Sequence, residues 1–122
     1  MKKKEHYIDN KRFQVLLENW FNNKDREAYQ EIGRIFLKIV NRILMRPSFI
    51  NYTDDYKNEM ISDATYYMVR YMDRYDLNRK NPFAYFSEIA IAAFIHYVVA
   101  MQKKSNKFVS IEFIDNMSRE GY

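Results

Sequence analysis

Residues 81–104 read NPFAYFSEIAIAAFIHYVVAMQKK, and this stretch contains the longest apolar run of the chain. Drawn as a helix, it is apolar around most of its circumference, which is typical of a helix in a protein core. Asn81 suits the N-cap and Pro82 the first helical position, where no N–H donor is needed. The longest apolar run, residues 89–101, is interrupted by one histidine and is shorter than the ~18 residues of a membrane span. We expect the central, most buried helix here, ending near Lys103, and no membrane association.

Three further helices are predicted before this stretch, over residues 9–23, 25–46 and 53–75. In each, apolar residues recur at i, i+3, i+4 and i+7, the spacing of one buried helix face. Thr53 suits an N-cap, and Pro47 ends the second helix because the residue before a proline is pushed out of the α region. The predicted stripes are Phe13, Leu16, Leu17, Trp20 and Phe21; then Ala28, Ile32, Ile35, Phe36, Ile39, Val40, Ile43 and Leu44; then Met60, Ile61, Ala64, Met68, Tyr71, Met72 and Tyr75.

A polar loop is expected over residues 76–80, and a short last helix is expected to start at Ser110. The chain has 122 residues with two glycines and two prolines, which suits one domain and leaves few turn residues for hairpins. We therefore predict an all-α fold, a compact bundle of about five helices, with the main helical domain over residues 9–109. Residues 1–8 are expected to form a mobile tail, and residues 110–122 a short C-terminal helix or tail.

Catalytic and metal-binding groups are scarce in this sequence. Cysteine is absent, so disulfides and thiolate ligands are excluded, and a reducing compartment is the default. The histidines are His6, near the N-terminus, and His96, which has no acidic residue at the spacing of a helical metal site. Gly33 and Gly121 cannot form a glycine-rich phosphate loop. We expect no enzyme activity, no metal and no cofactor.

The net charge of +4 is concentrated in one segment, Leu77–Ile111. A basic segment of this kind suits a polyanion such as nucleic acid, and a solvated basic rim is the alternative interpretation. The cations of the segment are Arg79, Lys80, Lys103, Lys104 and Lys107, opposed by Glu88 alone.

Tyrosine is unusually frequent, with eleven residues, and several should cluster where the third and fourth helices meet. Aromatic rings beside cations can hold unstacked bases, whereas rings at the rim of a core are the alternative. Tyr85 lies about 100° from the buried Phe86 on the helical wheel, so we expect its ring at the surface and little effect of Tyr85→Ala on stability. The expected cluster is Tyr66, Tyr67, Tyr71, Tyr75 and Tyr85.

The segment 58–76, NEMISDATYYMVRYMDRYD, resembles the core-binding helix of bacterial RNA polymerase sigma factors. In that family a polar, acidic half (Asp-Leu-Ile-Gln-Glu-Gly) leads to an aliphatic half that ends in Asp-Lys-Phe-Asp. Here Glu59, Ser62 and Asp63 stand at the polar positions, and residues 73–76 match the ending without a gap.

The resemblance continues after the predicted loop. Residues 82–86, PFAYF, stand where sigma factors have Phe-Ser-Thr-Tyr-Ala, with Tyr85 at the family's tyrosine. The late-gene sigma factors of T-even-like phages are similar in more detail. Their Tyr-Thr step, Glu-Met-Ile helix and Lys-Asn-Pro-x-Ala-Tyr sequence are matched by residues 52–53, 59–61 and 80–85.

The resemblance covers about residues 7–107 and implies a late-type sigma factor, a sigma domain-two protein of the infected bacterial cytoplasm. It implies that the third helix binds the large-subunit clamp helices of core RNA polymerase. The fourth helix would recognise and melt an AT-rich element of promoter DNA. The implied polymerase-binding residues are Glu59, Ser62, Asp63, Thr65, Tyr66 and Arg70. The DNA-binding residues are Arg79, Lys80, Tyr85, Glu88, Tyr97, Lys103, Lys104 and Lys107.

The C-terminal segment carries a second part of the resemblance. In the phage family a short acidic and hydrophobic tail binds the DNA sliding clamp, and residues 110–115 resemble it, with Ile111, Phe113 and Ile114 as the contact residues. Packing as a short last helix is the alternative. A phage co-activator is a further implied partner.

A second function stays open beside the sigma factor. The family's promoter-melting helix carries a tryptophan pair, where this chain has Glu88, Ile89 and a run of alanine and isoleucine. The alternative is therefore a helical adaptor that binds host polymerase or another protein and does not bind DNA.

Overall fold

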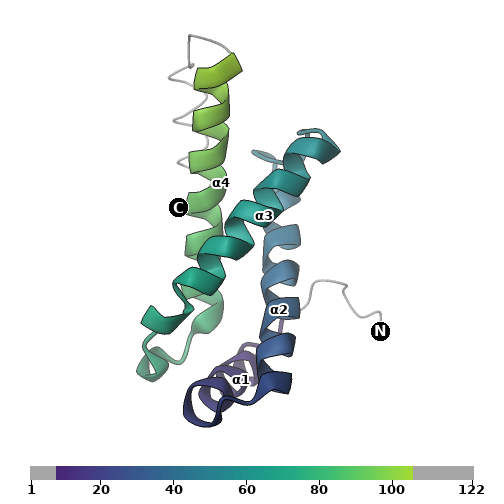
Figure 1. Ribbon diagram of the computed structural model, residues 1–122. Helices are drawn as coiled ribbons and strands as arrows, with labels where there is room; N and C mark the ends of the chain where they lie inside the picture. Colours follow the sequence, from purple (N-terminus) through teal and green to yellow (C-terminus); the bar gives the residue numbers. More distant parts are fainter. Residues whose placement is uncertain (1–7, 106–122) are drawn as a thin grey trace, which may run out of the picture.

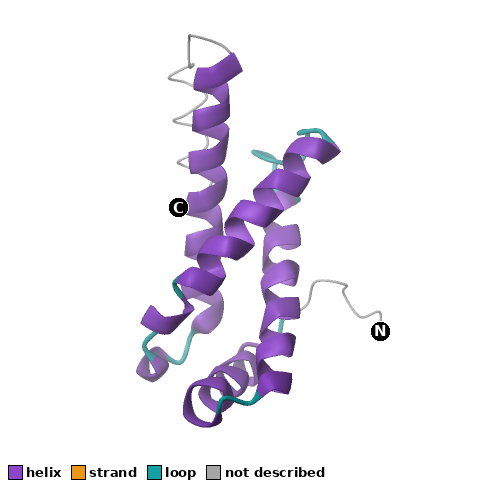
Figure 2. Cartoon of the chain, in the orientation of Figure 1, coloured by secondary structure: helices purple, strands orange, loops and turns teal. Residues whose placement is uncertain are grey.

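The computed structural model describes residues 8–105, which form four α-helices and two short 3-10 turns and contain no strand (Figures 1 and 2). The elements are α1 (Asn10–Asn23), α2 (Arg26–Leu44), α3 (Asp54–Arg70), η1 (Met72–Arg74), η2 (Leu77–Arg79) and α4 (Pro82–Ser105). In Figure 1, α2 and α4 run in the same direction, α3 crosses them in the opposite direction, and α1 lies at the end where α2 begins. The all-α prediction is confirmed. The predicted fifth helix lies outside the described residues.

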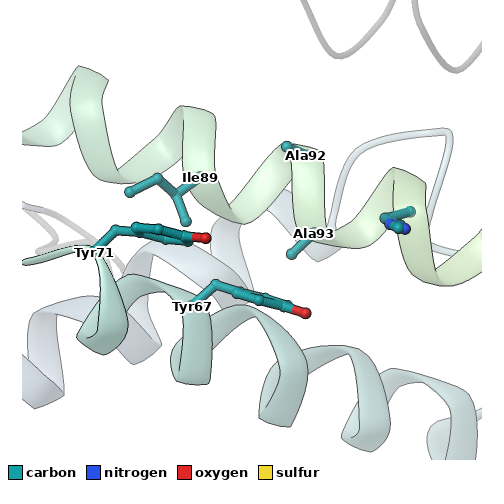
Figure 3. A pocket seen from close by; sticks show the side chains of 6 residues that line it. Tyr67, Tyr71, Ile89, Ala92 and Ala93 are labelled. Atoms are coloured by element: carbon teal, nitrogen blue, oxygen red, sulfur yellow. The ribbon is translucent and has the colours of Figure 1, made fainter.

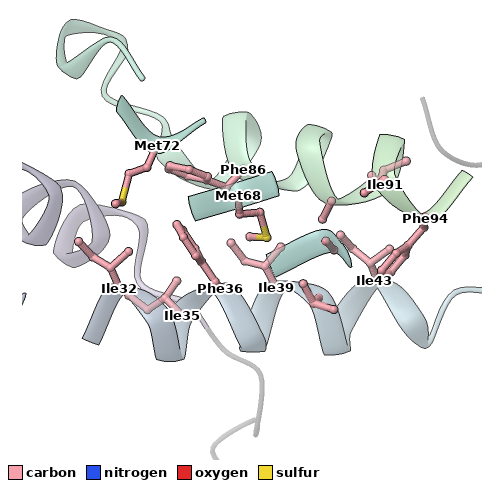
Figure 4. Packing of buried hydrophobic residues seen from close by; sticks show 14 of the residues in the cluster. Ile32, Ile35, Phe36, Ile39, Ile43, Met68, Met72, Phe86, Ile91 and Phe94 are labelled. Carbon is pink, nitrogen blue, oxygen red and sulfur yellow. The ribbon is translucent and has the colours of Figure 1, made fainter. Parts of the chain in front are cut away.

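The core is organised around α2, whose predicted apolar stripe is buried at every position. Figure 4 shows the α2 side chains pointing toward α4, with Met68 of α3 and Met72 of η1 packed among them. Phe36 of α2 packs on Phe86 of α4, with ring centroids 4.8 Å apart. Phe13 brings α1 onto the same rings, 5.5 Å from Phe86. Three helices therefore share one aromatic centre.

Side chains cap the first turn of each α-helix. The predicted N-caps Thr53 and Asn81 accept hydrogen bonds from backbone N–H groups three residues later, at 3.4 and 3.3 Å. Asp25 caps α2 by accepting from the Glu27 N–H at 3.0 Å, and Asp9 caps α1 in the same way. Each cap satisfies a donor that the helix cannot satisfy itself and contributes about 1 kcal/mol.

The connection between α3 and α4, predicted as a polar loop over residues 76–80, is held by a buried network. The Tyr75 hydroxyl donates to Gln14 Oε1 of α1 at 2.8 Å and accepts from the Asn81 N–H at 3.0 Å. Gln14 Nε2 in turn donates to the Leu77 carbonyl oxygen at 2.8 Å. Because buried polar groups are costly when unpaired, these bonds fix the two 3-10 turns against α1.

The helix α4 contacts α1, α2 and α3, which confirms its central position. The prediction that it is the most buried element is wrong for one face, where Ala92 and Ala100 are exposed and Ile89 is half-buried. Over Pro82–Lys103, α4 is long and apolar enough to cross a membrane by length and composition alone. Its contacts with the other three helices explain its apolar character on the packed side.

Candidate functional site

The predicted polymerase-binding residues lie on the exposed side of α3. The opposite side of this helix is buried through Met60, Ala64 and Met68. The positions on the exposed side follow helical spacing, so they form one continuous stripe. We call this stripe the α3 face; it consists of Glu59, Ser62, Asp63, Tyr66 and Arg70, all exposed.

Thr65, predicted for the same surface, is half-buried beside the α3 face. Its hydroxyl donates to the Ile61 carbonyl oxygen at 2.8 Å and lies 3.1 Å from that of Ser62. Because this donor is already used within the helix, Thr65 offers a partner little hydrogen-bonding capacity. Tyr66 instead stands out as the most exposed aromatic ring of the described chain, at 56 % exposure.

Glu59 and Tyr97, predicted for two different partners, are hydrogen-bonded to each other. The Tyr97 hydroxyl on α4 donates to Glu59 Oε1 on α3. Burial of the ring, followed by the hydrogen bond and negative charge of Glu59, raises the pKa of Tyr97 to about 12. The contact joins the α3 face to α4 and occupies the polar end of the Tyr97 ring.

A second group of side chains gathers at the C-terminal end of α3, where two arginines cover two tyrosine rings. The guanidinium of Arg74 lies 5.2 Å from the Tyr71 ring centroid, and that of Arg79 lies 5.9 Å from the Tyr85 ring. These are cation–π distances. We call Tyr71, Arg74, Arg79 and Tyr85 the arginine–tyrosine cluster. Arg74 was not predicted as a functional residue, although its i, i+4 spacing from Arg70 in the sequence could have indicated it.

Tyr85 is not placed as expected from the helical wheel. Its ring is half-buried in the seam between α3 and α4, 5.2 Å from the buried Tyr75 ring and 4.9 Å from that of Phe86. Its hydroxyl donates to the Tyr71 carbonyl oxygen at 2.8 Å, and burial raises its pKa. The expectation of a free surface ring is therefore corrected, because the end of α3 covers the side of α4 on which Tyr85 lies.

The cations that are close in the sequence are separated in space. Arg79 and Lys80 stand before α4, whereas Lys103 lies in its last turns, ~30 Å away at 1.5 Å per residue. Lys80 also lies 3.9 Å from Glu18, and the exposed Glu88 stands between the two basic ends. Lys104 lies in the last turn of α4. The predicted contact residues Lys107, Ile111, Phe113 and Ile114 lie outside the described residues.

A shallow groove of about 330 Å³ runs between α3 and α4. Figure 3 shows the Tyr67 and Tyr71 rings on α3 turned toward Ile89 and Ala93 of α4. The two tyrosine rings are stacked, with centroids 6.3 Å apart and planes 12° apart. The remaining lining residues are Ala92 and His96. The groove could not be predicted from the sequence, because it depends on how α3 and α4 cross.

The sequence matches no family model and no curated protein. A function is therefore inferred from the geometry of the α3 face and the arginine–tyrosine cluster.

Proposed function

We propose that this chain is a late-type sigma factor of the domain-two kind, acting in the cytoplasm of an infected bacterium. It binds core RNA polymerase through α3, and it recognises and melts an AT-rich promoter element. The observation that carries the proposal is the α3 face, an exposed polar and aromatic helix stripe at the positions where the sigma resemblance puts core binding.

The chemistry of the α3 face supports docking to a basic helical surface. Tyrosine and arginine, here Tyr66 and Arg70, are the residue types that contribute most to protein interfaces. Arg70 Nη1 lies 3.2 Å from the Tyr66 hydroxyl, so the two side chains are already paired before a partner arrives. Asp63 is exposed one turn away and would orient a cationic partner. A helix whose other side is buried presents these groups with little loss of conformational entropy on binding.

The arginine–tyrosine cluster supports contact with unpaired DNA. Single-stranded binding sites combine cations for the phosphates with aromatic rings for the bases. Arg74 and Arg79 are exposed, and the buried network at Tyr75 fixes the turns that carry them. Tyr71 offers a half-buried ring beside them. The cluster lies at the end of α3 and touches the α3 face at Arg70, whose guanidinium lies 5.9 Å from the Tyr71 ring. A DNA strand bound there would leave Ser62, Asp63 and Tyr66 accessible to polymerase.

Binding to host core polymerase tests the first half of the proposal. We expect Asp63→Lys with Tyr66→Ala to weaken binding by about 2–5 kcal/mol if these side chains are desolvated at the interface. The measurement is the Kd for core polymerase, with circular dichroism to check that the variant is folded. Both positions are exposed, so folding should be retained.

Glu27→Lys provides the matched control, because it changes the net charge equally and lies exposed on α2, away from the α3 face. Its polymerase affinity should stay within about threefold of that of the unmodified chain, since exposed charges far from an interface contribute little. A folded Asp63→Lys/Tyr66→Ala variant that binds polymerase as tightly as the control would contradict the assignment of the α3 face.

The adaptor alternative is favoured by one observation, the separation of the basic ends of α4. An adaptor needs no continuous basic surface, and the hydroxyls of Tyr85 and Tyr97 are both engaged within the chain. Transcription by core polymerase from a premelted AT-rich template separates the two functions. Stimulation that depends on Arg74 and Arg79 supports the sigma factor, whereas polymerase binding without any stimulation supports the adaptor.

A further inference from the structure

One face of α4 carries small and apolar residues that the described chain covers only in part: Ala92, His96 and Ala100 are exposed, Ile89 is half-buried and Ala93 is buried. Its positions follow i, i+3, i+4 and i+7 spacing, so they form one strip along the helix. Only 39 % of the most apolar window of α4 is buried. We call this strip the α4 strip; it consists of Ile89, Ala92, Ala93, His96 and Ala100.

The α4 strip is hollowed at two places. The groove with Tyr67 and Tyr71 lies at its N-terminal half. A second hollow of about 300 Å³ lies near Ala100, where Tyr56, Glu59, Tyr97 and Met101 complete the lining. Three of the five strip residues are alanines, whose small side chains allow another helix to approach closely. The strip therefore has the shape and chemistry of a helix-docking surface.

The C-terminal sequence is suited to cover this strip. At 100° per residue, one side of a helix starting at Ser110 would be apolar and the other polar. The apolar side would carry Ile111, Phe113, Ile114 and Met117. The polar side would carry Glu112, Asp115, Asn116, Arg119 and Glu120.

The length of this segment also fits. After the end of α4 at Ser105, 17 residues remain. Residues 106–109 suffice for a reversal of direction, since helix–helix connections commonly take 2–8 residues. A helix over residues 110–120 would be ~16 Å long, which reaches back along α4 from Lys103 to about Ala93. A helix of this length, docked through its apolar side, would therefore cover the C-terminal half of the α4 strip.

We propose that residues 110–120 bind the α4 strip as a helix antiparallel to α4. The proposal does not depend on the polymerase or DNA functions. It places Ile111, Phe113 and Ile114 against this chain, so any other protein that binds them must first displace the segment from α4.

The absence of cysteine allows a direct test in the full chain. His96→Cys and Met117→Cys are introduced together and treated with a short bismaleimide at low protein concentration. We expect an intramolecular cross-link with a yield roughly tenfold above the control pair, because docking raises the effective concentration of the two thiols. The control pair is Arg34→Cys with Met117→Cys, since Arg34 is exposed on α2, outside the α4 strip.

A single substitution provides an independent measurement that leaves the strip intact. A nitroxide label on Asn116→Cys, on the polar side of the segment, should broaden the amide signals of Ala92, His96 and Ala100 and spare those of Arg34. Equal yields for the two cysteine pairs, or uniform broadening, would overturn the proposal. Cross-linked dimers instead of monomers would overturn it in favour of a second copy on the strip. Broadening of the strip only upon addition of vesicles would overturn it in favour of a membrane surface.

Discussion

Tyr85 and Tyr97 each place a ring between α3 and α4 and use the hydroxyl to hold the two helices together. Tyr85 donates to the Tyr71 carbonyl oxygen, and Tyr97 donates to Glu59. Both rings are half-buried. These residues, implied as DNA contacts by the resemblance, thus have a role in stability that can be measured without DNA.

The first prediction concerns Tyr85. We expect Tyr85→Phe to lower the free energy of unfolding by about 1 kcal/mol, because it removes the hydrogen bond to Tyr71. Tyr85→Ala should cost about 2–3 kcal/mol, less than for a fully buried ring. Urea denaturation followed by circular dichroism measures both values.

Tyr66→Ala is the control for this prediction, because Tyr66 is exposed and is paired only on the surface. Its cost should be at most about 0.5 kcal/mol. If Tyr85→Ala were no more destabilising than Tyr66→Ala, the ring of Tyr85 would not stabilise the seam.

The second prediction concerns pH and Tyr97. Its pKa is about 12 in the folded chain, against about 10 for a tyrosine in an unfolded chain. The folded state therefore holds the phenol proton more tightly. The resulting stability is complete below about pH 10 and is lost as the pH rises toward 12.

Comparing urea midpoints near pH ~9 and ~11 checks this expectation, since the interval crosses the unfolded-state pKa of tyrosine. Tyr97→Phe should lose less stability over this interval than the unmodified chain. Glu59→Gln should fall between them, because the ring stays buried while the negative charge is removed. An identical loss in all three proteins would show that Tyr97 does not titrate as described.

At the scale of the elements, α2 is the helix that organises the core, yet it contains a glycine in its middle. Gly33 has an ordinary helical backbone, since no glycine among the described residues has a positive φ. A Cβ built at Gly33 would meet nothing within 4 Å. Neither the backbone conformation nor close packing within the described chain therefore requires a glycine at position 33.

The third prediction follows from this position. We expect Gly33→Ala to raise the free energy of unfolding by about 0.5–1 kcal/mol, because alanine loses less conformational entropy in a helix. Gln30→Ala, one turn earlier on the exposed side, should change it by less than about 0.4 kcal/mol. A loss of stability in Gly33→Ala would be incompatible with the open space at this site. A stable variant with weaker polymerase binding would identify Gly33 as a contact residue.

At the scale of the whole molecule, the distribution of charge depends on the path of the chain. The basic segment seen in the sequence is divided by the length of α4 into two ends ~30 Å apart. Tertiary folding adds Arg74 to the end that carries Arg79 and Tyr85. Any DNA that contacts both ends must span about 9 base pairs at 3.4 Å each.

The fourth prediction uses this separation. Because distant sites act independently, removing each basic end should reduce the salt dependence of DNA binding separately. Arg74→Gln with Arg79→Gln should lower the slope of log K against log salt by about 1.4 on single-stranded DNA. Replacing Lys103, Lys104 and Lys107 with glutamine should lower it by about 2.1.

Affinity of the polymerase complex for an AT-rich template, measured at several salt concentrations, gives these slopes. Arg34→Gln with Lys38→Gln, exposed on α2, is the control and should leave the slope unchanged. An unchanged slope in both sets of variants would favour the adaptor over the sigma factor.

The four helices of the described chain and most of their buried residues could be predicted from the sequence, but the end of α3 could not: it lies at Arg70, and residues 72–74 form a 3-10 turn where the helix was expected to continue to residue 75. The stripe of α2 and the caps Thr53 and Asn81 could be predicted because helical periodicity and capping are local properties, set by residues within a few positions of one another. The exposure of the α3 face could be predicted for the same reason, since its residues lie opposite the apolar stripe of a single helix, whereas its assignment to polymerase binding came from the resemblance.

Which of these surfaces come together depends on the packing of distant helices. Tyr85 and Tyr71 are 14 residues apart in the sequence, and Tyr97 and Glu59 are 38 residues apart. No local sequence pattern could therefore predict that the two residues of each pair are in contact. The helical wheel gives the direction of Tyr85 relative to its own helix, but the crossing of α3 over α4 decides whether that direction faces solvent. The same crossing leaves the α4 strip open although the residues of α4 are apolar on nearly every side. A helix is buried only where another segment lies against it, and that depends on packing between distant parts of the chain.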